Sequence, residues 1–340
     1  IGPQTFIAEL FHGPSLAFKD VATQIQARLH DLLLGRQGRQ QTILCATSGD
    51  TGGAAVEAFR GAKNVKVVVM FPEGRISEVQ RRFMTTAEES NIACVAVNGT
   101  FDGCQAILKD AFQDKGLRQS VDLAAVNSIN FARIAAQSVY FFTTAAALGA
   151  PDRAINFVVP SGNFGDAFAG YVAMRMGLPV RRIVVATNSN DILARAFTTG
   201  RYSRGAVLPT LSPAMDIQSA SNFERLYFEA VHREPVETAR AFEAFRTTGL
   251  IDIPPGALTA MQATFTGVAI GEDETLRTIV STLSETGELI DPHTAVAVAA
   301  LRHVPLEGVA GGMSTPQAAK FPEDVSRASG LEPGPPRRGA

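Results

Sequence analysis

Tryptophan is absent from this chain of 340 residues, which also has only three cysteines and five histidines. The cysteines, Cys45, Cys94 and Cys104, form no CxxC pair. We therefore interpret them as small buried residues in a reducing compartment, and not as a disulfide framework. The histidines show no HExxH or other paired ligand spacing, so the sequence predicts no metal site.

The chain also has no large excess of positive or negative charge. It contains 31 Lys and Arg residues and 33 Asp and Glu residues, which gives a net charge of −2. This balance provides no basic surface for nucleic acid. No apolar run is long enough to span a bilayer, and the first residues, IGPQTF, lack the pattern of a secretion signal. We expect a cytoplasmic protein that acts on a small molecule, with neither nucleic acid nor membrane as partner.

Short apolar segments alternate with polar loops and helical patterns along most of the chain. Hydrophobic residues make up 46% and charged residues 19%, which is typical of a globular protein. Predicted strands lie at 41–46, 66–71, 92–97, 154–160 and 181–187. This order predicts an α/β fold of two lobes, with open, mainly parallel sheets flanked by helices.

Domain boundaries follow from the same alternation. Residues 41–130 are self-contained strand–helix material, so we expect a small α/β domain inserted into a large, discontinuous domain of residues 1–40 and 131–330. The segment from about 234 to 302 is more helical and more charged, which suggests a peripheral cap. Residues 331–340, rich in Pro, Gly and Arg, are predicted to form a flexible tail.

Two loops follow predicted strands and lead into helices. SGNFGD (161–166) and TSGDTGG (47–53) both place glycines and amides where a helix begins, which is where anions bind in open α/β sheets. Each loop alone is weak evidence, because SGNFGD can be an ordinary strand–helix connection and Asp50 can merely cap a helix. Two such loops together favour two anion sites.

A lysine near the start of the chain follows a Gly-Pro turn and an apolar run, in HGPSLAFKD (12–20). Lys19 can be an ordinary solvated charge, or an amine held in an apolar pocket where it loses its proton more easily. Pyridoxal phosphate has a phosphate group and also needs a lysine amine, with which it forms a Schiff base. The lysine and the two loops together predict this cofactor.

Several longer segments are distinctive. With them, the chain resembles the threonine synthase family of bacteria and fungi, within the fold-type II (tryptophan synthase β-like) pyridoxal-phosphate enzymes. The matching segments are ELFHGPSLAFKD (9–20), ATSGDTGGAAVEAF (46–59), NSINFARI (127–134), PSGNFGDAFAGYVAMRMGLP (160–179), ATNSNDIL (186–193), SNFERL (221–226) and AKFPEDV (319–325). HGPSLAFKD and NSINFARI are distinctive of this family and not of the fold as a whole.

The resemblance implies a role for each matched position. Lys19 would hold the cofactor and later move protons. The cofactor phosphate would be bound by Ser161, Gly162, Asn163, Phe164 and Gly165. The substrate carboxylate and the cofactor's 3′-oxygen would face Ser48, Gly49, Asp50, Thr51 and Gly52, with Asp50 on the cofactor. The substrate's own phosphate would be bound by Asn127, Ser128 and Arg133. Thr315 or Ser314 would meet the pyridine nitrogen. Apart from the resemblance, His12 and His293 are interpreted as structural residues or as residues that support those in contact with the ligands.

The activity implied is the conversion of O-phospho-L-homoserine and water to L-threonine and phosphate. Three alternatives stay open: a related phospho-lyase that yields a keto acid, ammonia and phosphate, a truncated non-catalytic remnant, and a generic nucleotide-binding module. The sequence does not decide between a monomer and a dimer.

The chain departs from the family pattern at two places. An N-terminal subdomain of the family is expected to be missing before Ile1. Near the other end, Gln317 stands where the family has His, and GVAGGMS replaces a short apolar strand. The second departure leads us to expect altered packing around Thr315.

Overall fold

Two parallel sheets organise the chain, each in its own compact unit. The structure is a computed structural model that describes residues 1–126 and 130–334. One unit consists of Ile1–Leu10 and Gln137–Ala340, and the other of Phe11–Ala136. The mixed α/β architecture with mainly parallel sheets confirms the predicted fold class.

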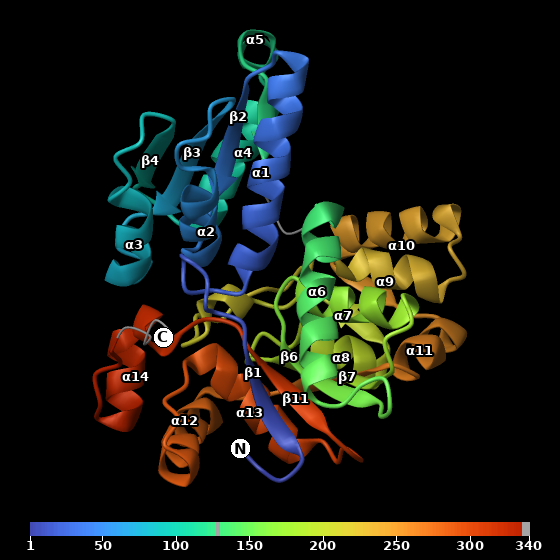
Figure 1. The fold of residues 1–340 in the computed structure, drawn as a ribbon. Helices are drawn as coiled ribbons and strands as arrows, with labels where there is room; N and C mark the ends of the chain where they lie inside the picture. The colour runs from blue at the N-terminus through green and yellow to red at the C-terminus, as the bar shows by residue number, and fades with distance from the viewer. Residues whose placement is uncertain (127–129, 335–340) are drawn as a thin grey trace. The chain divides into compact units, whose positions relative to one another are not determined.

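The larger unit contains a five-stranded sheet in the order β1-β11-β6-β7-β10, in which every pair is parallel. Its strands are β1 (Thr5–Glu9), β6 (Ile155–Pro160), β7 (Val180–Thr187), β10 (Phe265–Ala269) and β11 (Ala310–Ser314). Figure 1 shows the first strand of the chain beside the last one. All residues of β6 are buried, as expected for a central strand covered on both faces.

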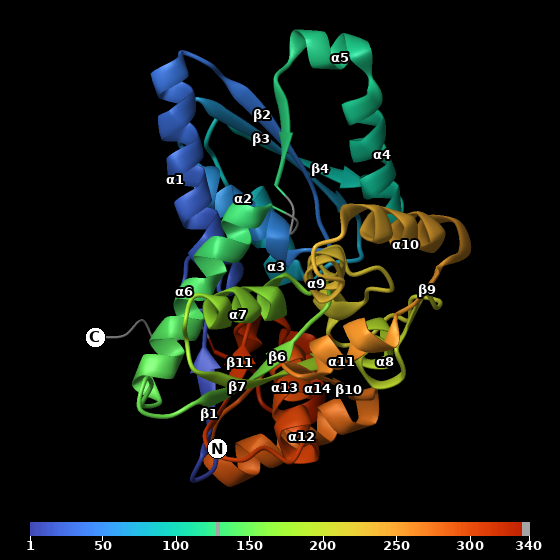
Figure 2. The same ribbon diagram turned by 90° about the vertical axis from the view of Figure 1, so that its right-hand side faces the viewer.

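Helices cover both faces of this sheet. A Cβ on Gly311 would meet Thr144 of α6 and Leu148 just after it, whereas one on the next residue, Gly312, would meet Leu301 of α13. Successive strand residues point to opposite faces, so α6 and α13 lie on opposite sides of the sheet. Figure 2 shows α7 on one side and α12 and α13 on the other. The helices of this part are α6 (Phe131–Ala147), α7 (Gly165–Arg175), α8 (Ile192–Thr199), α9 (Phe223–Ala230), α10 (Pro235–Thr248), α11 (Pro255–Gln262), α12 (Glu272–Thr286), α13 (Pro292–His303) and α14 (Pro322–Ser329).

Short elements connect these helices and strands. A two-stranded antiparallel ribbon joins β8 (Arg201–Ser203) to β9 (Leu250–Asp252), and two 3₁₀ turns are η1 (Pro213–Met215) and η2 (Ala318–Lys320).

The segment 234–302 is not a peripheral cap, so that expectation was wrong. It supplies β10, an edge strand of the main sheet, and α13, in which Pro292 to Leu301 are all buried. The reason is the small apolar run AVAVAA of α13, which packs against β6, β7 and β11 as part of the core. The charged residues that suggested a cap lie mainly on α10 and α12.

The smaller unit contains a four-stranded parallel sheet in the order β4-β3-β2-β5. Its strands are β2 (Gln41–Ala46), β3 (Val65–Pro72), β4 (Ile92–Val97) and β5 (Leu123–Ala125). Its helices are α1 (Lys19–Gln37), α2 (Asp50–Phe59), α3 (Glu78–Thr85), α4 (Phe101–Gln113) and α5 (Lys115–Ser120). In Figure 2, α1 and α4 lie on opposite sides of the sheet. The core is formed by alternating strand residues such as Ile43, Cys45, Val67 and Val69.

The division into units differs from the predicted domains at both ends of the insertion. The smaller unit begins at Phe11 and ends at Ala136, where residues 41–130 were expected. Helix α1 belongs to it because α1 packs along α2 and buries Ala27 and Leu34 in the same core. The predicted tail is described only as far as residue 334.

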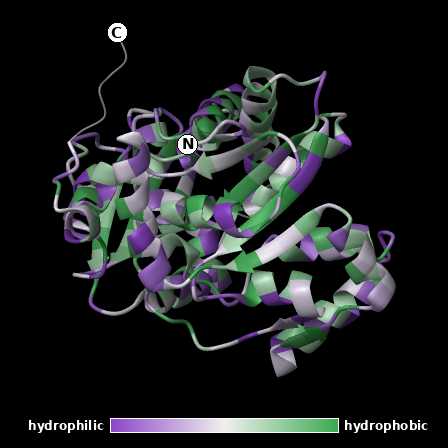
Figure 3. Cartoon of the chain, turned by 90° about the horizontal axis from the view of Figure 1, so that it is seen from below, coloured by the Kyte–Doolittle hydropathy of each residue, from purple (hydrophilic) through white to green (hydrophobic). Residues whose placement is uncertain are grey.

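Figure 3, coloured by hydropathy, shows most strands as apolar segments, in keeping with sheets buried on both faces. Among the residues that the structure describes, no helix combines the length and the apolar character needed to cross a bilayer.

One close approach in the larger unit gives a test of this packing. A Cβ on Gly267 of β10 would lie 2.7 Å from the Cα of Ala194 in α8, and backbone cannot move aside as a side-chain end can. Gly267→Ala is expected to lower the free energy of unfolding by about 1–3 kcal/mol, measured by urea denaturation. The matched control is Gly256→Ala in α11, where a Cβ meets nothing within 4 Å. That change is expected to leave stability the same or raise it, and an equal loss in both variants would contradict the assigned packing.

Candidate active site

Lys19 is the first residue of α1, directly after a tight turn. Leu16 in this turn has a φ of 56°, a left-handed conformation that is uncommon for a residue with a side chain. The turn is held by Asp20, whose Oδ2 accepts a hydrogen bond from the amide of Ser15 at 2.8 Å. The Lys19 side chain is 13% exposed, and its Nζ lies 5.6 Å from the centre of the Phe18 ring. The amine is therefore largely buried, next to an aromatic ring.

Asp50, the first residue of α2, is the acidic partner of this amine. Its Oδ2 lies 3.8 Å from Nζ of Lys19, and its side chain is 4% exposed. Its Oδ1 accepts a hydrogen bond from Nε2 of Gln80 at 3.1 Å. Gln80 is oriented by a capping box at the start of α3, because its Oε1 accepts from the amide of Ser77.

Gln80 is a site residue that sequence reasoning missed. The S-x-x-Q pattern of Ser77 and Gln80 signals a helix start. It does not reveal that the remaining amide of Gln80 reaches a carboxylate 30 residues away in the chain.

The loop before α2 presents hydroxyl groups at the carboxyl end of β2. Oγ1 of the buried Thr47 accepts hydrogen bonds from the amides of Gly49 and Gly52, both at 2.9 Å. The amides of these two glycines are therefore already hydrogen-bonded within the loop. Among the described residues, no partner is recorded for the hydroxyls of Ser48 and Thr51, so these are the better candidates to face an anion.

Arg133, near the start of α6, brings a second positive charge to the same region. Its side chain is buried, and the preceding Asn130 caps the helix by accepting from the amide of Ala132 at 2.9 Å. Burial raises the pKa of the Cys45 thiol to about 12, and the charges of Arg133 and Lys19 both oppose this rise. Both cations thus lie near the carboxyl end of β2. The other two predicted phosphate ligands, Asn127 and Ser128, lie outside the described residues.

In the larger unit, the loop 161–164 joins β6 to α7 and has the form of an anion cradle. Oγ of Ser161 is buried and has no hydrogen-bond partner among the described residues. A Cβ on Gly162 would lie 2.8 Å from the carbonyl oxygen of Ala214, so only glycine fits there. Phe164 has a φ of 64° and is the N-cap of α7, which turns the amides at the start of the helix toward the loop.

Neighbouring residues fix the second half of this loop, Asn163 and Phe164. The carbonyl oxygen of Asn163 accepts from the amide of Asn222 at 3.1 Å, and Oδ1 of Asn163 accepts from Oγ of Ser221 at 3.3 Å. The Phe164 ring is buried among Phe197, Phe223 and Phe265. Phe164 therefore anchors the loop through its ring, while its backbone supplies the turn.

Ser314 and Thr315 lie at the carboxyl end of β11, and both are buried. Oγ of Ser314 is 2.8 Å from Oγ1 of Thr294, which also contacts the carboxylate of Asp291. A carboxylate only accepts, so Thr294 donates to Asp291 and Ser314 donates to Thr294. The hydroxyl hydrogen of Ser314 is thus already donated to Thr294. Among the described residues, no partner of the Thr315 hydroxyl is recorded. This favours Thr315 as a donor to a pyridine nitrogen.

The second departure from the family pattern, at GVAGGMS and Gln317, is accommodated locally. AGGMS (310–314) forms the strand β11, between β1 and β6. The side chain of Gln317 caps the turn η2 by accepting from the amide of Ala319. The strand is thus present, with glycines at two of its positions.

These residues fit pyridoxal phosphate. The orphaned hydroxyl of Ser161 and the glycine-only contact at position 162 suit a phosphate in the larger unit. The largely buried amine of Lys19 in the smaller unit suits an aldehyde.

Comparisons with known proteins agree with this chemistry. The family model described as pyridoxal-phosphate dependent enzyme matches residues 4–252. The chain is 46% identical over 329 residues to the threonine synthase of Pseudomonas aeruginosa, which covers 95% of this chain and 69% of that protein. The chain belongs to the threonine synthase family of pyridoxal-phosphate dependent enzymes. This confirms the predicted family and cofactor.

Other members of the threonine synthase family are similar to the chain over comparable lengths. The threonine synthase of Saccharomyces cerevisiae is 40% identical, with 95% of this chain and 68% of that protein covered. The crystal structure of pyridoxal-phosphate-bound threonine synthase from Brucella melitensis superposes with a TM-score of 0.96 at 47% identity. It covers 98% of this chain and 72% of that one, so the chain spans about two thirds to three quarters of these relatives.

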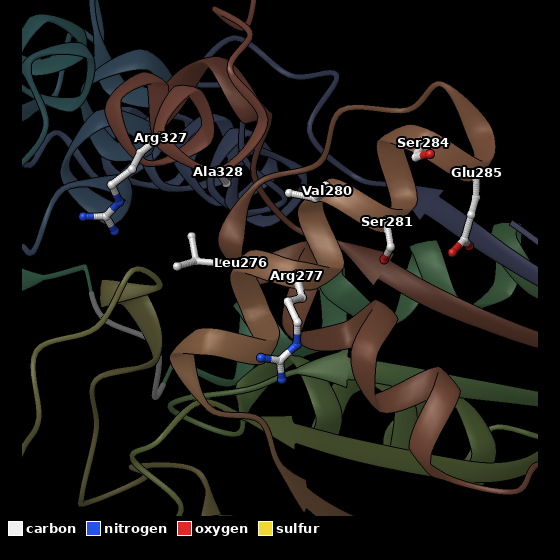
Figure 4. Close-up of a pocket in the computed structure, with 8 residues that line it drawn as sticks. All are labelled: Leu276, Arg277, Val280, Ser281, Ser284, Glu285, Arg327 and Ala328. Atoms are coloured by element: carbon white, nitrogen blue, oxygen red, sulfur yellow. The ribbon is translucent and has the colours of Figure 1, made fainter.

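A separate surface pocket of about 620 Å³ lies on α12 and α14 (Figure 4). Its lining includes Arg277, Val280 and Arg327, and no predicted site residue. In the described part of the chain, no cluster of His, Cys, Asp or Glu is arranged to hold a metal ion.

Asp166, in the first turn of α7, is a buried acid beside the cradle. Oδ1 of Asp166 accepts a hydrogen bond from the Tyr140 hydroxyl, and Oδ2 has no partner among the described residues. Burial raises the pKa of Asp166 from 3.8 to about 7, and the Tyr140 hydrogen bond opposes this.

The raised pKa predicts a pH-dependent stability. The native state holds its proton on Asp166 between about pH 4 and 7 while the unfolded state does not, so stability falls as pH rises through this window. Asp166→Asn removes this loss. The free energy of unfolding of the variant minus that of the parent protein should increase by up to about 4 kcal/mol between pH 4 and pH 7. Urea unfolding of both apoproteins measures this difference. A constant difference across that range would contradict the assignment.

Proposed function

We propose that the chain converts O-phospho-L-homoserine and water to L-threonine and phosphate, with pyridoxal phosphate as cofactor. The observation that carries this proposal is the buried pair Lys19 and Asp50, in a chain 46% identical to a threonine synthase. The two anion loops and the buried Arg133 support the same reaction, which needs sites for a carboxylate and for two phosphates.

Different residues of the chain are proposed to have different roles. The bound cofactor supplies an electron sink that makes the protons on the substrate's α and β carbons removable. Nζ of Lys19 is proposed to take the Cα proton, with Asp50 balancing the charge of the resulting ammonium. The hydroxyls of Ser48 and Thr51 are proposed to bind the substrate carboxylate. Loop 161–165 is proposed to hold the cofactor phosphate, and Thr315 to donate to the pyridine nitrogen.

Arg133 is proposed to bind the departing phosphate together with Asn127 and Ser128. A guanidinium group binds phosphate through two parallel hydrogen bonds, and negative charge on the phosphate oxygen grows as the Cγ–O bond breaks. The overall change balances. Cβ loses a proton and gains the hydroxyl of water, Cγ loses the phosphate and gains a proton, and the other proton of water goes to the released phosphate.

Product analysis in ¹⁸O-labelled water tests the reaction. We expect threonine with the label in its β-hydroxyl and one phosphate released per threonine. A keto acid with equimolar ammonia, and no threonine, would show the related phospho-lyase instead.

The role of Arg133 is tested by Arg133→Lys, which keeps the charge and loses the planar fork. The KM for phosphohomoserine is expected to rise about 10–100-fold, because the phosphate loses a bidentate partner, while cofactor retention changes less than about twofold. Steady-state kinetics and cofactor absorbance measure the two effects. Arg28→Lys on the exposed face of α1 is the control, and equal losses of substrate and cofactor binding by Arg133→Lys would remove the proposed role.

Location in the cytoplasm is proposed with this function, because the three free cysteines suit a reducing compartment.

A further inference from the structure

His293 is buried in the larger unit and bonded through both ring nitrogens. Its Nδ1 lies 2.8 Å from Oδ2 of Asp291, and its Nε2 lies 3.3 Å from the amide nitrogen of Ala214. The ring is 2% exposed and packs at 5.0 Å from the ring of Phe321.

The partners fix the protonation of the ring. The amide of Ala214 can only donate, so Nε2 of His293 must accept. The carboxylate of Asp291 accepts, so Nδ1 carries the hydrogen. The contacts therefore require the neutral imidazole in its Nδ1–H form.

The contact between His293 and Ala214 supports loop 161–165, which is proposed to bind the cofactor phosphate. Ala214 lies in η1, and its carbonyl oxygen would be 2.8 Å from a Cβ on Gly162. The segment is also anchored from its far side, because Asp216 accepts from the side chains of Asn188 at 2.9 Å, Asn190 at 3.0 Å and Thr210 at 2.6 Å. The backbone of η1 thus forms one wall of the site, and loop 161–165 packs against it at Gly162.

The contact between His293 and Asp291 supports the segment that contains Thr315. Asp291 caps α13 by accepting from the amides of His293 and Thr294. Thr294 in turn bonds Ser314, the residue before Thr315. One imidazole therefore connects the wall of the phosphate cradle to the proposed partner of the pyridine nitrogen.

We propose that His293 is a positioning residue for the cofactor, because its neutral ring sets the distance between the phosphate cradle and Thr315. The inference rests on the proposed function for the placing of the cofactor between these two groups. His293 itself touches neither the cofactor nor the substrate. It acts through Ala214 and through Asp291.

Two substitutions separate the hydrogen bonds from packing. His293→Phe keeps a buried ring against Phe321 and removes both ring nitrogens. The dissociation constant for pyridoxal phosphate is expected to rise about 10-fold or more, and the phosphorus NMR resonance of the bound cofactor should shift or broaden. His293→Gln places an acceptor near the position of Nε2, so it should restore affinity to within about threefold of the parent.

The matched control is His303→Gln on the same helix, where the histidine is exposed and pairs with Glu274. It is expected to leave both the cofactor affinity and the phosphorus resonance unchanged. Nitrogen NMR of histidine-labelled holoenzyme should show His293 as the neutral Nδ1–H tautomer, which gives a result even where a variant does not fold.

Three results would overturn the inference. They are a folded His293→Phe protein with parental cofactor affinity, equal losses in the Phe and Gln variants, and an Nε2–H tautomer. Failure of the proposed function is recognised separately, because it would appear as a parent holoenzyme that makes no threonine, whatever the His293 variants do.

Discussion

The contact between Nζ of Lys19 and the carboxylate of Asp50, at 3.8 Å, is the interaction on which the proposed chemistry depends. Both residues begin helices, and the positive end of a helix dipole favours an acid and disfavours a cation. Asp50 therefore sits at a favourable position, whereas the amine needs its carboxylate. Gln80 then orients that carboxylate from a third helix. The result is a largely buried amine whose charge is balanced by a neighbouring carboxylate.

In the larger unit, the loop proposed to hold the cofactor phosphate, 161–165, contains no cationic residue. Loop 161–165 presents backbone amides, turned by the left-handed Phe164 and held by its buried ring. The acid that follows, Asp166, is held neutral over much of the acidic range because its pKa is raised to about 7. A neutral Asp166 does not repel an anion at the same helix end. The wall of η1 and the ring of His293 complete the support.

Many of the strands, helices and loops that form the site could be predicted from the sequence, because local residue patterns determine them. The strand 41–46, the loop after it and the helix that begins at Lys19 all have strong local signals. What could not be predicted depends on contacts between distant parts of the chain. The amide of Gln80 reaches Asp50 only in the folded unit. Helix α13 was mistaken for a cap because β6 and β7, two of the strands that bury it, are far away in sequence. Choosing Thr315 over Ser314 required the observed bond to Thr294.

Borohydride reduction of the holoenzyme, followed by peptide mapping, tests the central assignment most directly. The account predicts a pyridoxyl group on Lys19, in the peptide that contains HGPSLAFKD, and loss of this label in Lys19→Ala. A label on another lysine, such as the buried Lys320, or no label on a protein that binds the cofactor, would contradict it.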